Sequence, residues 1–453
     1  MAITERIERT IEREAPSWGL RPTTPEVRRL RGVDFAVLWG DLALGLLVMV
    51  TGALLVPALG LPRALLAIGL GSALGCIPLA LVGRAGAREG VPGMVLLRGV
   101  LGARGSYIPT VLNVVQLVGW TAFELWAMAL VASRITGGGG ATFYVWLGIA
   151  TVVCLLLSLG GPVLVVRRWL ERFGLWVLAA AAGWITVRAL TTFDLGEMWS
   201  RPGQGGLPFG SAVDLVIAMP VSWIPLVADY NRFARRGVSS TAGTYLGYAA
   251  GNVWFFTLGA LLVLGAGSVP SPAGVADGIA TLAGGTMVLV VLLVGETDEA
   301  FADIYSAAVS AQNLAPRLNQ RVAIVAVAAI GAGLATWLFG LPDEGVLTYE
   351  FFLLLIGSVF VPLFAVFLAD HLVLRNRKGE RRGVSFPALL SWALGFAAYH
   401  ALTEVGPAGW VSAVKGAAGA IGLPHPLFGG AVPASVLSFA VAFVAAIILI
   451  RRR

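Results

Sequence analysis

Long apolar runs separated by arginine-rich loops dominate this sequence and limit it to folds that span a lipid bilayer. Runs of about 20 apolar residues can cross the hydrocarbon core as helices. The 453-residue chain is 57% hydrophobic and 13% charged, whereas a soluble domain carries about 25% charged residues. The sequence therefore predicts an all-α polytopic membrane protein. We expect twelve transmembrane helices, at residues 33–58, 63–82, 106–132, 142–163, 172–190, 211–231, 241–266, 280–314, 322–340, 348–373, 384–403 and 431–450.

The placement of basic residues predicts the orientation of these helices. Lys and Arg concentrate in cytoplasmic loops of membrane proteins, and here they fall in every second loop and at both chain ends. The exceptions are Arg63, Arg134, Arg188, Arg201 and Lys415. We therefore expect a multi-pass protein of the cell (plasma or inner) membrane with both termini cytoplasmic. Because the net charge of +7 follows from this topology, nucleic acid is not a predicted partner.

The predicted helix at 280–314 carries four carboxylates within apolar sequence, namely Glu296, Asp298, Glu299 and Asp303. A carboxylate at the bilayer centre costs about 2.5–3.5 kcal/mol on insertion scales, so such residues face a bundle interior or a water-filled cavity. Glu296, Glu299 and Asp303 follow an i, i+3, i+7 spacing, which places them on one helical face. We interpret them as a cation or proton site in a transporter. The alternative, a helix cap at a membrane surface, is disfavoured by the apolar sequence on both sides.

Two other predicted helices carry features that interrupt helices in transporters, where substrates bind near the bilayer midplane. Pro220 and Pro225 lie inside the run 211–231, and each proline removes an intrahelical hydrogen bond. The run 33–58 holds a weaker pattern, with glycines on both sides of Asp41. The sequence therefore predicts the clearer interruption at 211–231, with a simple kink as the alternative.

The predicted helix at 106–132 supplies groups that suit a flat, hydrogen-bonding ligand. Gln116, Trp120 and Glu124 are spaced i, i+4, i+8 and share one stripe of the helix. A ring can stack on the indole, a contact worth about 0.5–1.5 kcal/mol beyond area burial, and the carboxylate can accept hydrogen bonds from ring N–H or amino groups. The alternative for Trp120 is packing or an interfacial role, and the neighbouring Glu124 favours a ligand.

Several of these segments resemble the nucleobase–cation symporter-1 family, which includes cytosine permeases and transporters of hydantoins, allantoin and hydroxymethylpyrimidine. The resemblance lies in LLRGVLGARGSYIPTVLNVVQLVGW (Leu96 to Trp120), SWIPLVADYNRFAR (Ser222 to Arg235), FLADH (Phe367 to His371) and ETDEAFADIYSAAVSAQNL, which begins at Glu296. The last phrase is most similar to the hydroxymethylpyrimidine branch. Similarity covers roughly residues 25–400.

This resemblance implies the leucine-transporter type of fold, in which two five-helix inverted repeats precede two additional helices. The corresponding units are a cytoplasmic arm at 1–32, a first repeat at 33–190, a second repeat at 211–373 and the additional helices at 384–450. It also implies a monomer that needs no organic cofactor, with the lipid bilayer, a small heterocycle and a cation as its partners.

The resemblance further implies one planar heterocycle held between Trp120 and Trp223, with Gln116, Glu124 and the backbone at Ser222 reading its edges. In the family, a sodium ion sits between helix 1 carbonyls and helix 8 polar side chains. By position, that cation site falls at Ala43, Leu46, Gly295, Thr297 and Asp298. The family uses hydroxyls and amides on helix 8 where this chain has carboxylates, so both Na⁺ and H⁺ stay open as coupling ions. Glu299 would then carry a proton or contact the substrate.

We therefore expect a secondary-active symporter that imports a pyrimidine-type nucleobase, cytosine or hydroxymethylpyrimidine, by alternating access. A carrier of a purine, a hydantoin or allantoin is the nearest alternative. A membrane-embedded enzyme is disfavoured, because His371, His400 and His425 are scattered and form no metal or acid–base motif. No catalytic residue is predicted. A passive channel is disfavoured because acids lie well inside only three apolar runs.

Overall fold

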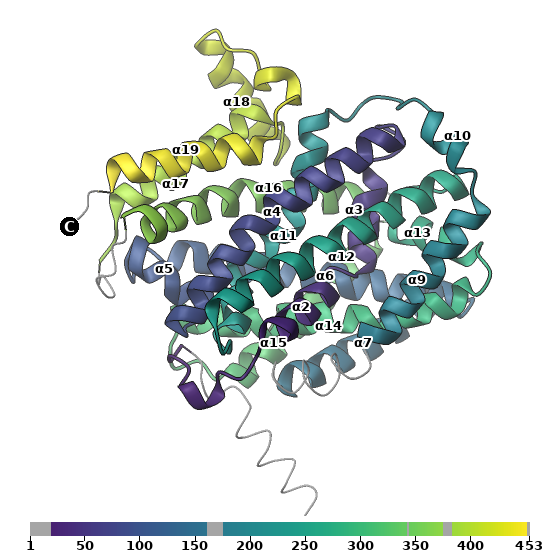
Figure 1. The fold of residues 1–453 in the computed structure, drawn as a ribbon, viewed down its shortest axis with the longest axis horizontal. Coiled ribbons are helices and arrows are strands. Elements are labelled where there is room, and N and C mark those ends of the chain that lie inside the picture. Colours follow the sequence, from purple (N-terminus) through teal and green to yellow (C-terminus); the bar gives the residue numbers. More distant parts are fainter. Residues whose placement is uncertain (1–19, 161–174, 342–343, 375–382, 451–453) are drawn as a thin grey trace, which may run out of the picture.

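The apolar runs fold into helices that cross the molecule side by side (Figure 1). The computed structural model describes residues 20–160, 175–341, 344–374 and 383–450. Its helices are η1 (Pro25–Val27), α2 (Gly32–Asp41), α3 (Leu46–Leu54), α4 (Leu61–Glu89), α5 (Gly93–Leu101), α6 (Tyr107–Ile135), α7 (Gly140–Gly160), α9 (Leu175–Thr192), α10 (Leu195–Ser200), α11 (Phe209–Asn231), α12 (Gly237–Ala266), α13 (Pro272–Ala280), α14 (Gly285–Leu314), α15 (Gln320–Phe339), α16 (Glu344–Leu368), η3 (Ala369–Leu374), α17 (Phe386–Leu402), α18 (Ala408–Ala420), η4 (Leu427–Gly430) and α19 (Ala434–Leu449). Within those ranges, β-structure is limited to one isolated bridge between Leu30 and Ala234. The predicted all-α class is confirmed.

Seven of the described helices are long and apolar enough to cross a membrane: α4, α6, α7, α11, α12, α15 and the continuous run of α16 with η3. The bent pair α2–α3 adds an eighth, while α9, α17 and α19 are shorter apolar helices. Each of the twelve predicted runs overlaps a described helix or helix pair, although the count of twelve transmembrane helices stays a prediction. Residues 1–19 of the predicted arm lie outside the described residues, as do residues 161–163 and 172–174 of two predicted helices.

The helix α11 lies at the centre of the bundle, and every residue from 212 to 231 is buried. It packs against α4 and α16, while α14 packs against α6, and α12 packs against α2, α3 and α4. The helices α7 and α15 pack on α6 and α14, and α17 and α19 pair beside α16 (Figure 1, upper left). The helices α6, α11 and α14 therefore supply interior walls that are shielded from lipid.

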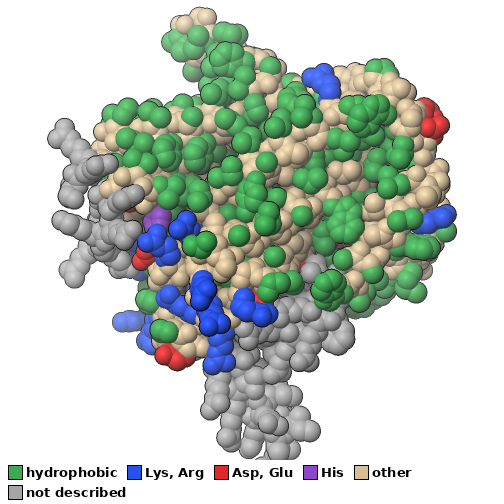
Figure 2. Space-filling model, viewed as in Figure 1, with side chains coloured by type: hydrophobic (Ala, Val, Ile, Leu, Met, Phe, Trp, Pro, Cys, Tyr) green, Lys and Arg blue, Asp and Glu red, His purple; other side chains and the backbone are tan. Residues whose placement is uncertain are grey.

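The outer surface matches the hydrophobic interior of a bilayer. Exposed large apolar side chains recur along α4, α7 and α9, and Figure 2 shows hydrophobic side chains spread over most of the visible face. In the same view, Lys and Arg side chains gather at the lower left, near η1 and α5 of Figure 1. This segregation is what a positive-inside topology produces.

The structure confirms the weaker of the two predicted helix interruptions and not the clearer one. The helix α11 continues through Pro220 and Pro225, so the predicted interruption there is wrong, whereas α2 and α3 meet at a 61° bend. Burial on all sides holds α11 in place. The Ser222 carbonyl beside the prolines accepts a hydrogen bond from Gln116 Nε2 at 3.0 Å. The carbonyls that lose an intrahelical donor are those of Val216 and Val221, four residues before each proline, and both residues are buried within the bundle.

The segment before α2 is docked onto the ends of two helices. Thr23 Oγ1 donates to the carbonyl of Gly90 at 3.2 Å and to that of Arg232 at 2.8 Å. Leu30 N donates to Phe233 O at 3.1 Å, and Leu30 O accepts from Arg235 N at 2.8 Å. Residues 20–31 therefore join the C-terminal ends of α4 and α11 to the start of α2.

Between α17 and α19, the chain forms the short helices α18 and η4. The helix α18 has no buried residue, and Figure 1 shows it projecting from one end of the bundle. The helix α19 begins with a cap from another helix, since the Asp214 carboxylate of α11 accepts from Ala434 N at 2.7 Å and from Ser435 N at 2.9 Å. This contact ties the C-terminal helix pair to the central helix.

We predict that Asp214→Ala destabilises the protein by about 1–3 kcal/mol, because two buried N–H groups lose their carboxyl acceptor. Asp277→Ala is the control, since Asp277 pairs with Arg134 on the surface and such pairs contribute about 0–1 kcal/mol. The measurement is the thermal unfolding midpoint of the purified protein. Equal midpoints for the two variants would contradict the capping role.

Candidate substrate and cation site

The bend between α2 and α3 meets α14 at its carboxylates. Leu46 N, the first amide of α3, donates a hydrogen bond to a Glu296 carboxylate oxygen. A side-chain carbon placed on Gly45 would collide with the carboxylate of Glu299, so Glu299 occupies the space that the glycine leaves. A helix N-terminus has unpaired N–H groups and the positive end of the helix dipole, which both favour a nearby anion. The face of α14 predicted from the i, i+3, i+7 spacing therefore points at this bend.

Two further acids complete what we call the carboxyl cluster. Asp41, the last residue of α2, lies near Glu299, and Glu124 of α6 lies beside Asp303. The carboxyl cluster consists of Asp41, Glu124, Glu296, Glu299 and Asp303. All five side chains are at most 5% exposed. The acids of three separate helices thus share one buried region.

In the part of the chain that the structure describes, no buried basic residue balances the carboxyl cluster. Among the described residues, Arg232 is the one buried arginine or lysine, and it lies beside Asp229 and Tyr305. Uncompensated carboxylates at bilayer depth cost about 2.5–3.5 kcal/mol each, so five together would cost as much as the whole net stability of a typical protein, which is about 5–15 kcal/mol. The cluster must therefore be neutralised by bound cations, by protons or by both.

The predicted stripe on α6 lies within the same interior. Gln116, Trp120 and Glu124 are all buried, and Gln116 Nε2 donates to the Ser222 carbonyl of α11. Among the described residues, Gln116 Oε1, Trp120 Nε1 and both Glu124 oxygens have no hydrogen-bond partner outside the carboxyl cluster. Buried polar atoms nearly always have a partner, so this stripe has the unsatisfied donors and acceptors that a polar ligand would complete.

The two predicted stacking tryptophans belong to different aromatic groups. Trp120 meets Tyr349 and Phe352 of α16 edge-on, with ring centroids 5.9 and 5.3 Å apart. Trp223 meets Trp39 of α2 edge-on at 6.0 Å. No ring contact joins Trp120 to Trp223 in the described part of the chain, so the two indoles are not stacked on each other. Each indole instead meets its aromatic neighbours by an edge.

The structure separates the predicted cation residues. Ala43 and Leu46 lie at the bend between α2 and α3. Gly295 packs against Leu178 of α9, and Asp298 is buried near Cys154 of α7. Thr297 is partly exposed, and its hydroxyl donates to the Val294 carbonyl at 2.7 Å. Gly295 and Thr297 therefore have neighbours other than the bend, whereas Asp298 also lies near Glu299.

The sequence predicts Glu296 and Asp303 as part of a cation or proton site but gives neither a contact, and it assigns no such role to Asp41. Glu296 binds the first amide of α3, Asp303 lies beside Glu124, and Asp41 ends α2. The helical spacing of Glu296 and Asp303 with Glu299 was the signal for two of them. Tyr349 was also missed; its hydroxyl donates to the Leu47 carbonyl at 3.1 Å and joins α16 to α3.

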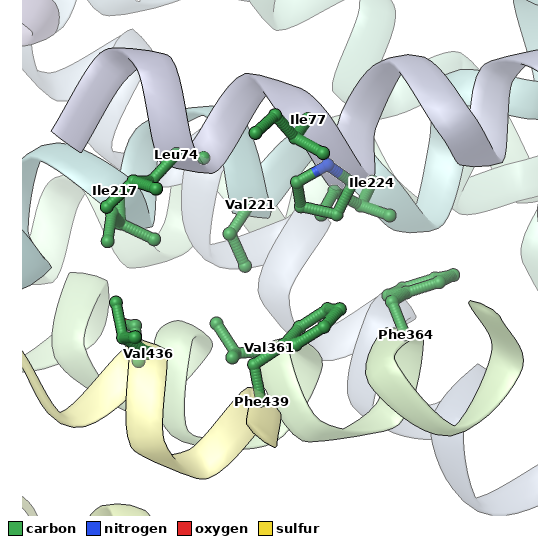
Figure 3. Close-up of a pocket in the computed structure, with 12 residues that line it drawn as sticks. Leu74, Ile77, Ile217, Val221, Ile224, Val361, Phe364, Val436 and Phe439 are labelled. Atoms are coloured by element: carbon green, nitrogen blue, oxygen red, sulfur yellow. The ribbon is translucent and has the colours of Figure 1, made fainter. Parts of the chain in front are cut away.

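A separate apolar cavity of about 190 Å³ lies between α4, α11, α16 and α19. Figure 3 shows its lining, with Val221 and Ile224 of α11 near Val361 and Phe364 of α16. No charged residue lines this cavity. It therefore offers no counterpart to the carboxyl cluster and is not the candidate site.

Comparison with known proteins identifies the family. Residues 22–423 match the family of permeases for cytosine/purines, uracil, thiamine and allantoin. The chain belongs to this family. It is therefore a multi-pass membrane permease and not an enzyme, and the family resemblance noted in the sequence is confirmed.

Individual relatives of the permease are distant but nearly full-length. A hydantoin permease of Microbacterium maritypicum is 24% identical over 79% of this chain and 76% of its own length. A cytosine permease of Escherichia coli K12 is 25% identical over 82% of this chain and 85% of its own. The structure of Mhp1, a nucleobase-cation-symport-1 family transporter in a closed conformation with bromovinylhydantoin bound, has a TM-score of 0.76 at 20% identity and covers 96% of this chain and 94% of that chain. The permease therefore has a transporter fold of known type.

We predict that Gly45→Ala lowers cation-dependent uptake by about tenfold or more. The added methyl group would displace the Glu299 carboxylate, and disrupting one buried polar contact costs about 1–3 kcal/mol. The matched control is Gly69→Ala, because Gly69 on α4 has open space around it. Uptake into proteoliposomes would measure both variants. Normal cation-dependent uptake by Gly45→Ala would show that uptake does not require the Glu299 carboxylate to lie against Gly45.

Proposed function

We propose that this permease is a secondary-active symporter that imports a pyrimidine-type nucleobase, cytosine or hydroxymethylpyrimidine, together with Na⁺ or H⁺ by alternating access. The observation that carries the proposal is the carboxyl cluster, which meets the bend between α2 and α3 and has no buried basic partner among the residues that the structure describes. A carrier that binds its coupling ion at such a site can use the ion gradient to drive uptake. The stripe of unsatisfied polar atoms on α6 supports a heterocyclic substrate beside it.

The proposed cation site lies between the bend and α14. Interrupted helices supply free backbone carbonyls that bind coupling ions in transporters, and the bend spans residues 42–45. Glu296 and Glu299 add carboxylate oxygens, which are the hard ligands that Na⁺ accepts. A proton could take the place of Na⁺, because burial disfavours ionised carboxylates without a counter-ion. Ala43 and Leu46 keep their predicted role through their carbonyl groups.

The proposed substrate position runs along α6. The ring would lie against Trp120 and Trp223, and Gln116, Glu124 and the backbone at Ser222 would read its edges. The name of the E. coli relative supports a cytosine-like substrate. The name of the Microbacterium relative supports the alternative, a hydantoin carrier. A purine or allantoin would also suit a site for planar heterocycles.

The remaining proposals concern the setting of the protein. We place it in the cell membrane with both termini cytoplasmic, which the collected basic side chains in Figure 2 support. The expected state is a monomer of two inverted repeats, at 33–190 and 211–373, that needs no organic cofactor.

Uptake into proteoliposomes tests the coupling. Labelled cytosine and hydroxymethylpyrimidine would be offered under an imposed Na⁺ gradient, an imposed proton gradient, or neither. The proposal expects saturable uptake that one of the gradients accelerates. If both bases are taken up at rates that neither gradient changes, the symporter mechanism is overturned. If neither base moves while a purine or hydantoin does, the pyrimidine assignment fails and the coupling proposal remains.

We predict that Trp120→Ala lowers substrate affinity by about tenfold, since it removes a stacking contact worth about 0.5–1.5 kcal/mol beyond area burial together with part of the buried area. Trp199→Ala is the control, because Trp199 is 59% exposed on α10. Affinity would be measured by equilibrium binding to purified protein. Unchanged affinity in a folded Trp120→Ala variant would remove Trp120 from the site.

A further inference from the structure

We infer that Glu124 and Asp303 act as a pair that selects a basic, amino-substituted heterocycle over a neutral lactam ring of the same shape. This inference rests on the proposed function, because it assigns a substrate class to the same site. It adds Asp303 to the substrate-reading residues. It also gives the carboxyl of Glu124 a role that the amide of a glutamine at this position would not have.

The pair joins two interior helices. Glu124 is 1% exposed on α6 and Asp303 is 2% exposed on α14, and their carboxyl groups lie side by side. Apart from their contact with each other, both oxygens of Glu124 and Oδ2 of Asp303 have no hydrogen-bond partner among the described residues. The pair therefore has buried oxygen atoms that can contact a third group.

Independent atoms indicate that this third group is a ligand. Trp120 Nε1 and Gln116 Oε1 also have no partner among the described residues, although Trp120 is 5% and Gln116 is 3% exposed. Both residues lie on the same stripe of α6 as Glu124. A ligand along this stripe would meet an indole, an amide oxygen and the carboxyl pair in turn.

Hydrogen bonding alone does not separate the two classes of ring. An aminopyrimidine edge offers an amino donor beside a ring-nitrogen acceptor, while a lactam edge offers an N–H donor beside a carbonyl acceptor. A carboxylate with a neighbouring carboxylic acid can satisfy either edge. The distinction comes from charge.

The carboxyl pair favours a ring that can become positive. Two adjacent carboxylates in a dry site cannot both stay ionised, so one proton is held between them. A basic ring nitrogen can take up that proton, which moves from the carboxyl oxygen to the ring, and the resulting cation then donates two hydrogen bonds to carboxylates. A lactam nitrogen lacks the basicity for this transfer. Charge-assisted hydrogen bonds are roughly twice as strong as neutral ones.

The surroundings of the pair strengthen this preference. Glu124 also lies near Glu296, Glu299, Cys154 and Tyr349, and Asp303 lies near Tyr230. None of these groups carries positive charge. Among the described residues, the buried basic side chain Arg232 lies by Asp229 instead. A cationic ring would therefore be the nearest positive charge to the pair, apart from the coupling ion.

Matched pairs of bases test this inference with the full-length protein. Cytosine and uracil differ at one edge, where cytosine has the amino group and basic nitrogen and uracil has the lactam; adenine and hypoxanthine differ in the same way. Equilibrium binding of all four to the wild type is expected to favour the amino member of the bound pair by about tenfold. This comparison does not depend on any variant folding.

Two isosteric variants then assign the preference to the pair. In Glu124→Gln and in Asp303→Asn, the ratio of amino to lactam affinity is expected to fall to about one, because an amide can neither give up a proton nor balance a cation. Asp277→Asn, on the surface of α13, is expected to keep the wild-type ratio.

The outcomes separate the inference from the function. Equal binding of both members, tighter binding of the lactam, or an unchanged ratio in both isosteric variants would overturn the inference and leave the heterocycle carrier intact. If the wild type neither binds nor moves any of the four bases, a hydantoin or allantoin, the proposed function itself fails and the inference falls with it.

Discussion

The contact between the first turn of α3 and the carboxylates of α14 is the interaction on which the rest of the site depends. Leu46 N donates to Glu296, and Gly45 leaves room for Glu299. A helix that bends by 61° in the bundle interior needs partners for the backbone groups it frees. A carboxylate at a helix N-terminus supplies one such partner, and it in turn gains from the helix dipole. The bend and the acids of α14 therefore stabilise each other.

This arrangement links the proposed ion to the proposed substrate through charge. Glu299 at the bend, Asp303 one turn further along α14 and Glu124 on α6 form a continuous series of buried acids. A cation at the bend changes the field at Glu124, and a substrate on the α6 stripe changes the field at Glu299. Such mutual dependence is a coupling free energy, and it acts equally in both directions. The acidic face of α14 together with Glu124 of α6 is sufficient to carry it.

The sequence predicts the helices well, because each apolar run must form a helix in lipid whatever its neighbours are. It also predicts that Glu296, Glu299 and Asp303 share a face. The prediction of an interruption at 211–231 fails. Pro220 and Pro225 indicate only the loss of local hydrogen bonds, whereas α11 is buried on all sides and stays helical. The sequence places Thr297 beside the ion, yet a shift of one residue turns a helix by about 100° and directs Thr297 away from the bend. Which neighbour each helix face contacts depends on tertiary packing, and local sequence patterns do not predict it.

The central claim, that the buried acids at the bend require a bound cation or proton, is tested most directly without substrate. The measurement is the thermal unfolding midpoint of the purified protein across Na⁺ concentrations, with choline as the control, at neutral and at mildly alkaline pH. A species that binds only the folded state raises the midpoint as its concentration rises. The account predicts that Na⁺ or added acid raises the wild-type midpoint and that the response shrinks in Glu299→Gln. A wild-type midpoint that responds to neither would contradict the account.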